Sequence, residues 1–195
     1  MKFILASGSS SRAQILRDAG VPFTAYPAHT DEDAVKNEMQ GAGGRAVAEK
    51  LAELKALHIS TQHPQDLVLG ADQVLVLDNE LFSKAETLDT AATQLRRLRG
   101  KSHQLIGALV LARDGKPVWQ HTETSTLWVR DFSEEFLKTY LAAEGKPLLG
   151  SVGCYRFEGL GAQLFERVEG DYFSVLGLSL LPLLGALREY GVIET

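Results

Sequence analysis

The stretch that most constrains the fold is the apolar run from Leu67 to Leu77. A run this continuous and β-branched predicts a strand buried on both faces, near the middle of a sheet. One ionisable residue, Asp72, interrupts it directly after the small pair Gly70-Ala71. A buried carboxylate costs several kcal/mol unless a cation, a metal or hydrogen bonds compensate it, and small neighbours allow a ligand to approach the backbone closely. Asp72 is therefore either a buried acid satisfied by neighbouring amides or a carboxylate that faces a ligand.

The composition allows one sizeable α/β domain or two closely joined lobes, with 45% hydrophobic and 23% charged residues in 195. No stretch is long and apolar enough to span a membrane, and the N-terminus lacks the apolar segment of a signal peptide. The single cysteine, Cys154, excludes an internal disulfide and is typical of a reducing cytoplasm. A net charge of -5 argues against a general nucleic-acid-binding protein, although a few convergent cations are enough for a small anion. We therefore expect a cytoplasmic enzyme or binding protein with neither nucleic acid nor membrane as partner.

The N-terminal segment has the order of an anion-binding helix start. A short apolar strand at 3–6 is followed by a Gly/Ser loop that contains Ser7, and then by a helix with Arg12 in its first turn. This order presents backbone N–H groups, hydroxyls and a guanidinium to an anion. A serine-rich capping loop that binds nothing is equally common, so both interpretations stay open. The loop is not a P-loop, because it lacks Gly-Lys-Ser/Thr at the required spacing.

Two further segments carry charged candidates. The acidic cluster 31–33 is by default a solvated loop, although grouped carboxylate oxygens also suit a hard cation such as Mg²⁺. A long helix is predicted from Arg45 to about His58, and Lys50 and Lys55 both fall at or near its apolar arc. Periodicity does not choose between the two lysines.

Beyond the central strand, a turn at 78–80 reverses the chain, so that Lys84 can return to the same end of the sheet as Asp72. The glycine-rich segment 145–161 is typical of a loop that lines a ligand site, and Arg156 and Glu158 are its polar candidates.

The remaining elements mix strands and helices along the whole chain. Strands are expected at 23–26, 103–111, 119–129 and 163–168, and helices over 87–98, 133–143 and around 183–187. With both hairpin-like and crossover connections, this order predicts an α/β fold around a mixed sheet, formed by residues 1–195 as a single domain.

Motifs spread over nearly the whole chain resemble the Maf family, the nucleoside triphosphate pyrophosphatases first named for septum formation. The shared segments, in order, are Leu5 to Ser9 followed by Arg12, the acid pair ending in Glu32, Leu51 to Ala56, Gly70-Ala71-Asp72, Lys84, Gly145-Lys146-Pro147, Glu158 to Gly161, Gly170-Asp171-Tyr172, and Val175 to Leu178. Each is weak alone, but their order and spacing together are specific.

The resemblance implies a fold and an activity. The fold is a mixed, elongated sheet flanked by helices, with two lobes and a deep cleft, similar to inosine triphosphate pyrophosphatases. The activity is hydrolysis of a nucleoside triphosphate to a monophosphate and pyrophosphate with a divalent cation, Mg²⁺ or Mn²⁺. A homodimer is the family's habit.

The resemblance also implies roles for individual residues. It makes Asp72 the catalytic base and Glu32, together with Asp72, the metal-site acids. The phosphate-binding residues are Ser7, Arg12, Lys55 and Lys84, which settles Lys55 over Lys50. A triphosphate carries about four negative charges, so these cations must neutralise it before water attacks. Asp72 can then deprotonate that water, provided that it is not itself held in a salt bridge.

Departures from the family pattern indicate which branch this chain belongs to. The common Pro-Arg-Arg is Ser10-Ser11-Arg12 here, so one arginine is missing. Ser151-Val152-Gly153 replaces Lys-Ala-Gly, and Glu158-Gly159 replaces Gln-Gly. Two prolines are also lost, at Lys84-Ala85 and Gly177-Leu178-Ser179.

The lost arginine, Gln73 after the base and Glu158 resemble the branch that acts on 7-methyl-GTP more than the dTTP/UTP branch. A carboxylate suits both the N–H donors of a guanine edge and the positive charge of a methylated purine. The alternatives are a dTTP/UTP-type enzyme, or a weakly active nucleotide-binding regulator of cell division in which the missing cations reduce turnover.

Overall fold

The computed structural model describes residues 1–194, which form two compact units. Unit 1 comprises Met1–Gln73, Ile106–Glu123 and the chain from Asp171 onwards, and unit 2 comprises Val74–Leu105 and Thr124–Gly170. Within residues 1–194, no helix has the length and apolar character needed to cross a membrane.

Strands and helices alternate irregularly along the chain, as the sequence indicates. In order, with η for a 3-10 helix, they are β1 (Phe3–Leu5), α1 (Ser10–Asp18), β2 (Thr24–Ala25), α2 (Glu32–Glu38), α3 (Gly44–Ser60), β3 (Leu67–Leu77), β4 (Glu80–Leu81), α4 (Leu88–Leu98), β5 (Ser102–Arg113), β6 (Lys116–Val129), α5 (Glu134–Glu144), η1 (Lys146–Gly150), η2 (Leu160–Leu164), β7 (Phe165–Glu169), α6 (Tyr172–Val175) and α7 (Leu180–Glu189).

The strands form one mixed sheet in the order β2-β1-β3-β5-β6-β7, with β4 paired to β3. β1 is parallel to β2 and β3, whereas the β3–β4 and β6–β7 pairs are antiparallel. In β3 every residue except Gln73 and Val76 is buried. The predicted α/β class, mixed sheet and buried interior strand are therefore confirmed.

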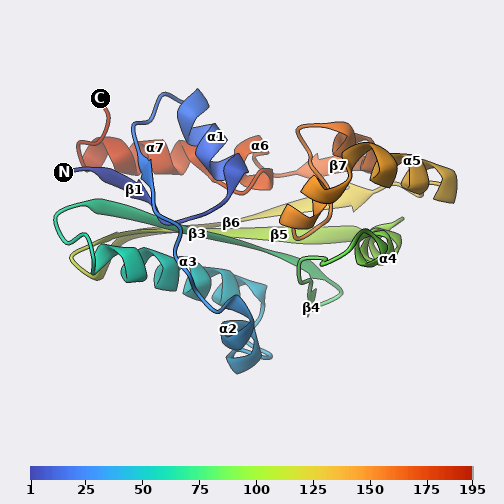
Figure 1. Cartoon of the computed structure of the whole chain (residues 1–195), viewed down its shortest axis with the longest axis horizontal. Helices are drawn as coiled ribbons and strands as arrows, with labels where there is room; N and C mark the ends of the chain where they lie inside the picture. The colour runs from blue at the N-terminus through green and yellow to red at the C-terminus, as the bar shows by residue number, and fades with distance from the viewer. Residues whose placement is uncertain (195) are drawn as a thin grey trace. The chain divides into compact units, whose positions relative to one another are not determined.

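Helices flank the sheet within unit 1. Figure 1 shows α1 and α7 on one side of β1 and β3, and α3 on the other. Side chains from α1, α7 and one face of β1 and β3 share a core cluster that includes Leu5, Leu16, Leu69 and Leu187. Burial of these apolar faces is the main favourable contribution to the stability of the unit.

The contact between α3 and β3 depends on Gly70. A Cβ placed there would lie 2.1 Å from the carbonyl oxygen of Ala52 and 2.5 Å from the amide nitrogen of Ala56, both on α3. The sequence predicts that this small residue admits a ligand, and that interpretation is wrong for Gly70, because the helix backbone fills the space.

Several element bounds differ from the expectation. The acidic cluster is not a loop: Asp31 caps α2 by accepting a hydrogen bond from the amide of Ala34 at 3.0 Å. α2 buries none of its residues, so it has no apolar periodicity that could predict it. The strand expected at 163–168 starts later, because η2 precedes β7, and β2 is only two residues long.

Two tight turns between strands lie where Asp, Asn and Gly residues in the sequence indicate them. Asp78 and Asn79, between β3 and β4, have φ values of 51° and 67°, and Asp114 and Gly115, between β5 and β6, have 51° and 68°. Two consecutive positive φ values are the hairpin geometry that Asp, Asn and Gly adopt most easily.

Candidate functional site

The first turn of α1 and the loop before it place Arg12 and Ser7 against each other in unit 1. Ser9 caps the helix by accepting a hydrogen bond from the Arg12 amide at 3.4 Å. The Ser7 Oγ accepts from the Ser9 amide at 3.3 Å and from Arg12 Nη1 at 3.0 Å. Because both interactions use lone pairs of Ser7, its O–H hydrogen stays available to an acceptor. The helix start therefore presents a hydroxyl and a guanidinium together, as an anion requires.

Lys55 lies between two carboxylates in the same unit. Its Nζ donates to Glu32 Oε1 and to Asp72 Oδ1, at 2.6 Å in each case. The Lys55 and Asp72 side chains are 9% and 8% exposed, so this is a buried ion pair. Lys50, by contrast, is 47% exposed and pairs with Glu53 at 3.9 Å on the helix surface. Of the two lysines that periodicity could not separate, Lys55 is the buried one.

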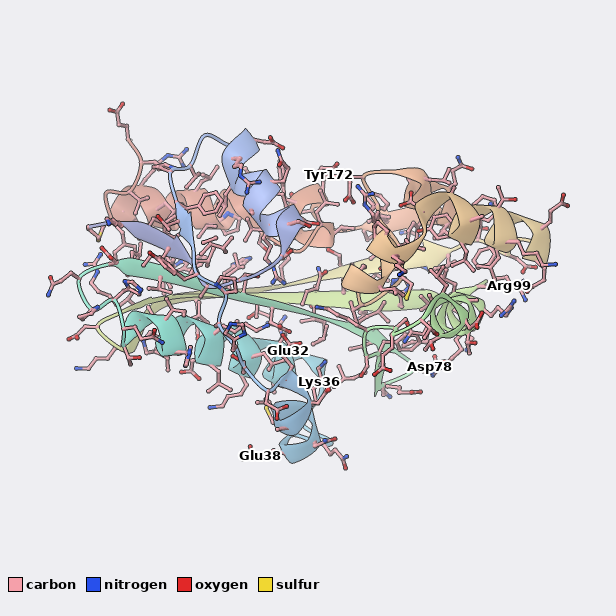
Figure 2. All side chains as sticks on the ribbon, viewed as in Figure 1. Glu32, Lys36, Glu38, Asp78, Arg99 and Tyr172 are labelled. Carbon is pink, nitrogen blue, oxygen red and sulfur yellow. The ribbon has the colours of Figure 1, made fainter. Side chains whose placement is uncertain are left out.

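Three different elements bring this triad together. Asp72 is on β3 and Glu32 is the first residue of α2. Lys55 is on α3, which packs against β3 at Gly70. Figure 2 shows Glu32 at the α3 end of α2, with Glu38 at the opposite end. Helix α2 therefore delivers a single carboxylate to Lys55 while the rest of its length stays at the surface.

Burial dominates the electrostatics of this group. It raises the pKa of Asp72 above its ordinary value, against the opposing effects of Lys55 and Arg12. It also lowers the pKa of the Arg12 guanidinium, which Asp72 and Glu32 oppose. Charged groups are therefore held in a poorly solvated site, where their interactions with a ligand are stronger than in water.

As a catalytic base, Asp72 is expected to be free of salt bridges. In the structure this condition is not met, because Lys55 holds one of its oxygens in a salt bridge. The other oxygen, Oδ2, has no hydrogen-bond donor within residues 1–194. One oxygen is thus fixed by the lysine, while the second remains the one that can accept a proton from water.

Three residues complete the surroundings: Gln73, which the sequence marks only as typical of one family branch, and Ser174 and Gly177, which have no predicted role. The Arg12 Nε donates to the carbonyl oxygen of Gly177 at 2.9 Å, and the Gln73 Nε2 donates to the carbonyl oxygen of Ser174 at 2.8 Å. Gly177 has a φ of 101°, which side chains rarely adopt. The sequence signal for the contact of Arg12 with Gly177 is that Gly177 lies in the Val175 to Leu178 motif.

Lys84 and Glu158 belong to unit 2. Lys84 is exposed and takes part in no ion pair among residues 1–194. Glu158 Oε1 lies 3.4 Å from Arg156 Nε, and Arg156 Nη1 is also 3.6 Å from Glu144 Oε2. The structure thus brings together Ser7 with Arg12 and Lys55 with Glu32 and Asp72 in unit 1, and places Lys84 and Glu158 separately in unit 2.

The loop that carries Glu158 is held by a buried polar group. The His103 Nε2 is 2.7 Å from the Tyr155 hydroxyl, and its Nδ1 has no hydrogen-bond partner among the described residues. The backbone of Cys154 has a φ of 55°, and the Tyr140 hydroxyl donates to its carbonyl oxygen at 3.4 Å. Arg156 and Glu158 therefore follow a stretch of backbone, Cys154 and Tyr155, that these contacts hold in place.

The chain is similar to known proteins along nearly its whole length. It is 51% identical over 192 residues to a nucleoside triphosphate pyrophosphatase from Granulibacter bethesdensis, covering 97% of this chain and 98% of that protein. It is 45% identical over 195 residues to a 7-methyl-GTP pyrophosphatase from Rhizobium etli, covering 99% and 98%. A solved HAM1 protein from Coxiella burnetii superposes with a TM-score of 0.45 at 16% identity, covering 68% of this chain and 74% of that one.

The profile of the family described as Maf-like protein matches residues 2–190. Together with relatives of this identity and coverage, this match extends over both units and every residue of the candidate site. The chain belongs to the Maf-like protein family.

Proposed function

We propose that this protein hydrolyses a nucleoside triphosphate to a monophosphate and pyrophosphate. The observation that carries the proposal is the buried group in unit 1, where Lys55 joins Asp72 to Glu32 and where Arg12 and Ser7 lie at the start of α1. The names of the relatives support the same reaction class. A buried carboxylate among cations is what water attack on a polyanion requires, whereas binding alone does not.

Each residue has a distinct role in the proposed reaction. Arg12 and Ser7 bind phosphate oxygens as fixed donors, and Lys55 and Lys84 add positive charge to a substrate that carries about four negative charges. Asp72 accepts the proton of the attacking water through Oδ2, because Oδ1 is bound to Lys55. The raised pKa of Asp72 makes it a stronger base than an exposed aspartate.

The acids of unit 1 fit a divalent cation, Mg²⁺ or Mn²⁺. Glu32 and Asp72 each place one oxygen 2.6 Å from Lys55 Nζ, so the two carboxylates lie close together. Among residues 1–194, no group of three or more His, Cys, Asp or Glu side chains is arranged to hold a metal. Two carboxylates are nevertheless enough for Mg²⁺, which usually completes its shell with water and substrate phosphates. Such an ion supplies charge neutralisation at the phosphates.

We propose 7-methyl-GTP as the preferred substrate class, with Glu158 recognising the base. Glu158 is exposed in unit 2, and its partner Arg156 is shared with Glu144, so the carboxylate is held by a single long ion pair. A carboxylate complements both the N–H donors of guanine and the positive charge of its methylated ring. We further propose that both units act as one cytoplasmic Maf-like domain. A dTTP/UTP preference, or binding with little turnover, is the alternative.

The first experiment is product analysis with the purified protein. A panel of common NTPs and dNTPs, 7-methyl-GTP and modified pyrimidine triphosphates is incubated with Mg²⁺ or Mn²⁺, and both products are identified. Monophosphate plus pyrophosphate from 7-methyl-GTP supports the proposal. Preferential cleavage of dTTP or UTP refutes the substrate assignment. Tight binding of one nucleotide without turnover refutes the reaction and favours a regulatory role.

A further inference from the structure

A second polar network lies in unit 1, next to the segment that contacts Gln73 and Arg12. Its centre is Ser174, in α6, which is 5% exposed. The Ser174 Oγ is 2.8 Å from Glu123 Oε2, 3.0 Å from Asp171 Oδ2 and 2.9 Å from the Oγ of Ser179. Nothing in the proposed reaction uses Glu123, Asp171 or Ser179.

The hydrogens available decide how this network is arranged. Ser174 has one hydroxyl hydrogen, but two carboxylates approach it. Asp171 Oδ2 is already satisfied by the Ser174 amide at 2.8 Å, as the cap of α6. The hydroxyl therefore donates to Glu123 Oε2, and His121 Nε2 lies 3.5 Å from the same oxygen.

Glu123 is held as an anion in this position. Burial raises its pKa, but hydrogen bonds from Ser174, His121 and Ser179 outweigh that effect and keep the pKa below its ordinary value. A charged acceptor forms a stronger hydrogen bond than a neutral one. Glu123 thus fixes Ser174 from β6, while Asp171 fixes it from the start of its own helix.

The segment that this network fixes holds two neighbours of the proposed chemistry. The carbonyl oxygen of Ser174 accepts from Gln73, the residue after Asp72, and the carbonyl oxygen of Gly177 accepts from the Arg12 guanidinium. A Cβ added at Gly177 would lie 3.7 Å from Gln73 Oε1 and 3.8 Å from Arg12 Nε, so both side chains meet at this one residue. α6 is only four residues long and has little stability of its own.

We propose that Glu123 and Ser174 are positioning residues that hold Arg12 and the Asp72-Gln73 pair in register through residues 171–177. The expected effect on turnover rests on the proposed function. The expected effect on the position of Arg12 rests only on the contacts described above. Without Glu123, Ser174 keeps only its contacts with Asp171 and Ser179, which belong to the same stretch of chain, and the Gly177 carbonyl is free to shift away from Arg12. A misplacement of about 1 Å at a reacting centre costs on the order of a hundredfold in rate.

The kinetic test compares Glu123→Ala, Ser174→Ala and Glu123→Gln. Both alanine variants should lower kcat by at least about tenfold and change KM by less than about threefold, because groups are misaligned rather than removed. Glu123→Gln should retain kcat within about threefold, since its amide oxygen accepts the same hydrogen bond from Ser174. Glu53→Ala, which removes an exposed carboxylate from α3, is the matched control and should leave kcat unchanged.

A second measurement does not depend on turnover. The Arg12 Nε–H is partly buried and donates to the carbonyl oxygen of Gly177, so its hydrogen exchange can be followed by NMR, with Arg12→Lys assigning the resonance. Both alanine variants should accelerate this exchange by about tenfold or more, and Glu123→Gln and Glu53→Ala should not.

The outcomes separate the two proposals. If the wild-type protein releases no pyrophosphate from any nucleotide, the proposed function fails, while the Arg12 exchange still decides the positioning role. Unchanged Arg12 exchange in both alanine variants overturns the inference, whatever their kinetics. Equal kinetic losses in Glu123→Gln and Glu123→Ala also overturn it, because the hydrogen-bonding geometry would then be irrelevant.

Discussion

Replacing Gly70 by alanine tests how the buried triad is assembled. The added Cβ would lie 2.1 Å from the Ala52 carbonyl oxygen and 2.5 Å from the Ala56 amide nitrogen. Relaxed non-bonded contacts are about 3.5 Å, so the two elements must separate by roughly 1 Å. The two closest atoms belong to the backbone of α3, so no side-chain rotation can relieve the clash with them. The whole helix must move away from β3.

The expected cost follows from that displacement. Overpacking a core costs about 1–3 kcal/mol, and a backbone clash belongs at the upper end of this range. In a chain of this size each kcal/mol lowers Tm by about 2–4 °C, so a decrease of about 6–12 °C is expected. Lys55 precedes Ala56 on α3, so its 2.6 Å bond to Asp72 cannot persist, and kcat should fall with Tm.

Thermal unfolding followed by circular dichroism measures the effect, with Gly107→Ala as the control. Gly107 is also in the sheet, but a Cβ there would meet no atom closer than Gln73 Nε2 at 4.0 Å. Removing the Ala56 methyl in a Gly70→Ala, Ala56→Gly double variant should not restore Tm, because the clash is with backbone atoms. A Gly70→Ala protein as stable as Gly107→Ala, or a full rescue by the second change, would refute the close-approach argument.

Three further predictions concern single ionisable residues. Asp72→Asn should abolish turnover while nucleotide affinity stays within about tenfold, since only the base is lost; because burial raises the pKa of Asp72, the acid limb of the wild-type kcat–pH profile should lie above 3.8, and loss of binding by a folded variant would contradict the assignment. Glu158→Gln should raise KM for 7-methyl-GTP more than for a pyrimidine triphosphate, and equal changes would exclude Glu158 from base recognition. Burial lowers the pKa of His103 from 6.5 to about 4 in the folded protein. Between these two pH values His103 binds a proton in the unfolded chain but not in the folded one, so the free energy of unfolding decreases as the pH falls from 6.5 to about 4. Urea unfolding at about pH 5 should show a loss of about 2 kcal/mol relative to about pH 7, and a His103→Gln protein with the same pH dependence would contradict this reasoning.

The sequence predicts most of the central sheet because strong local patterns agree with the tertiary fold. The run from Leu67 to Leu77 is apolar throughout, and its interior position in the sheet follows from the need to bury both faces. The turns at 78–79 and 114–115 combine Asp, Asn and Gly in positions where φ must be positive. These are properties of a few adjacent residues, so a single sequence contains them.

Other features cannot be predicted from local patterns, because they depend on contacts between distant segments; only the family resemblance indicates Glu32 and Lys55. α2 buries no residue, and only its first residue, Glu32, reaches Lys55. Lys50 and Lys55 are both compatible with the apolar arc of α3, and the choice is made by what lies opposite, Asp72 on β3. The role that we propose for Glu123 is less visible still, since it depends on a contact with the Ser174 hydroxyl 51 residues away.

The ion pair between Lys55 and Asp72 does not need to break for the proposed chemistry to proceed. An ammonium group has three N–H donors, and in this structure two of them are used by Glu32 and Asp72. The third can bind a phosphate oxygen while the first two stay in place. Binding of a phosphate there draws the lysine charge away from Asp72 and makes its second oxygen a better proton acceptor. In the reaction that we propose, Lys55 therefore couples phosphate binding to activation of the base, and Glu32 keeps its ammonium in position to do so.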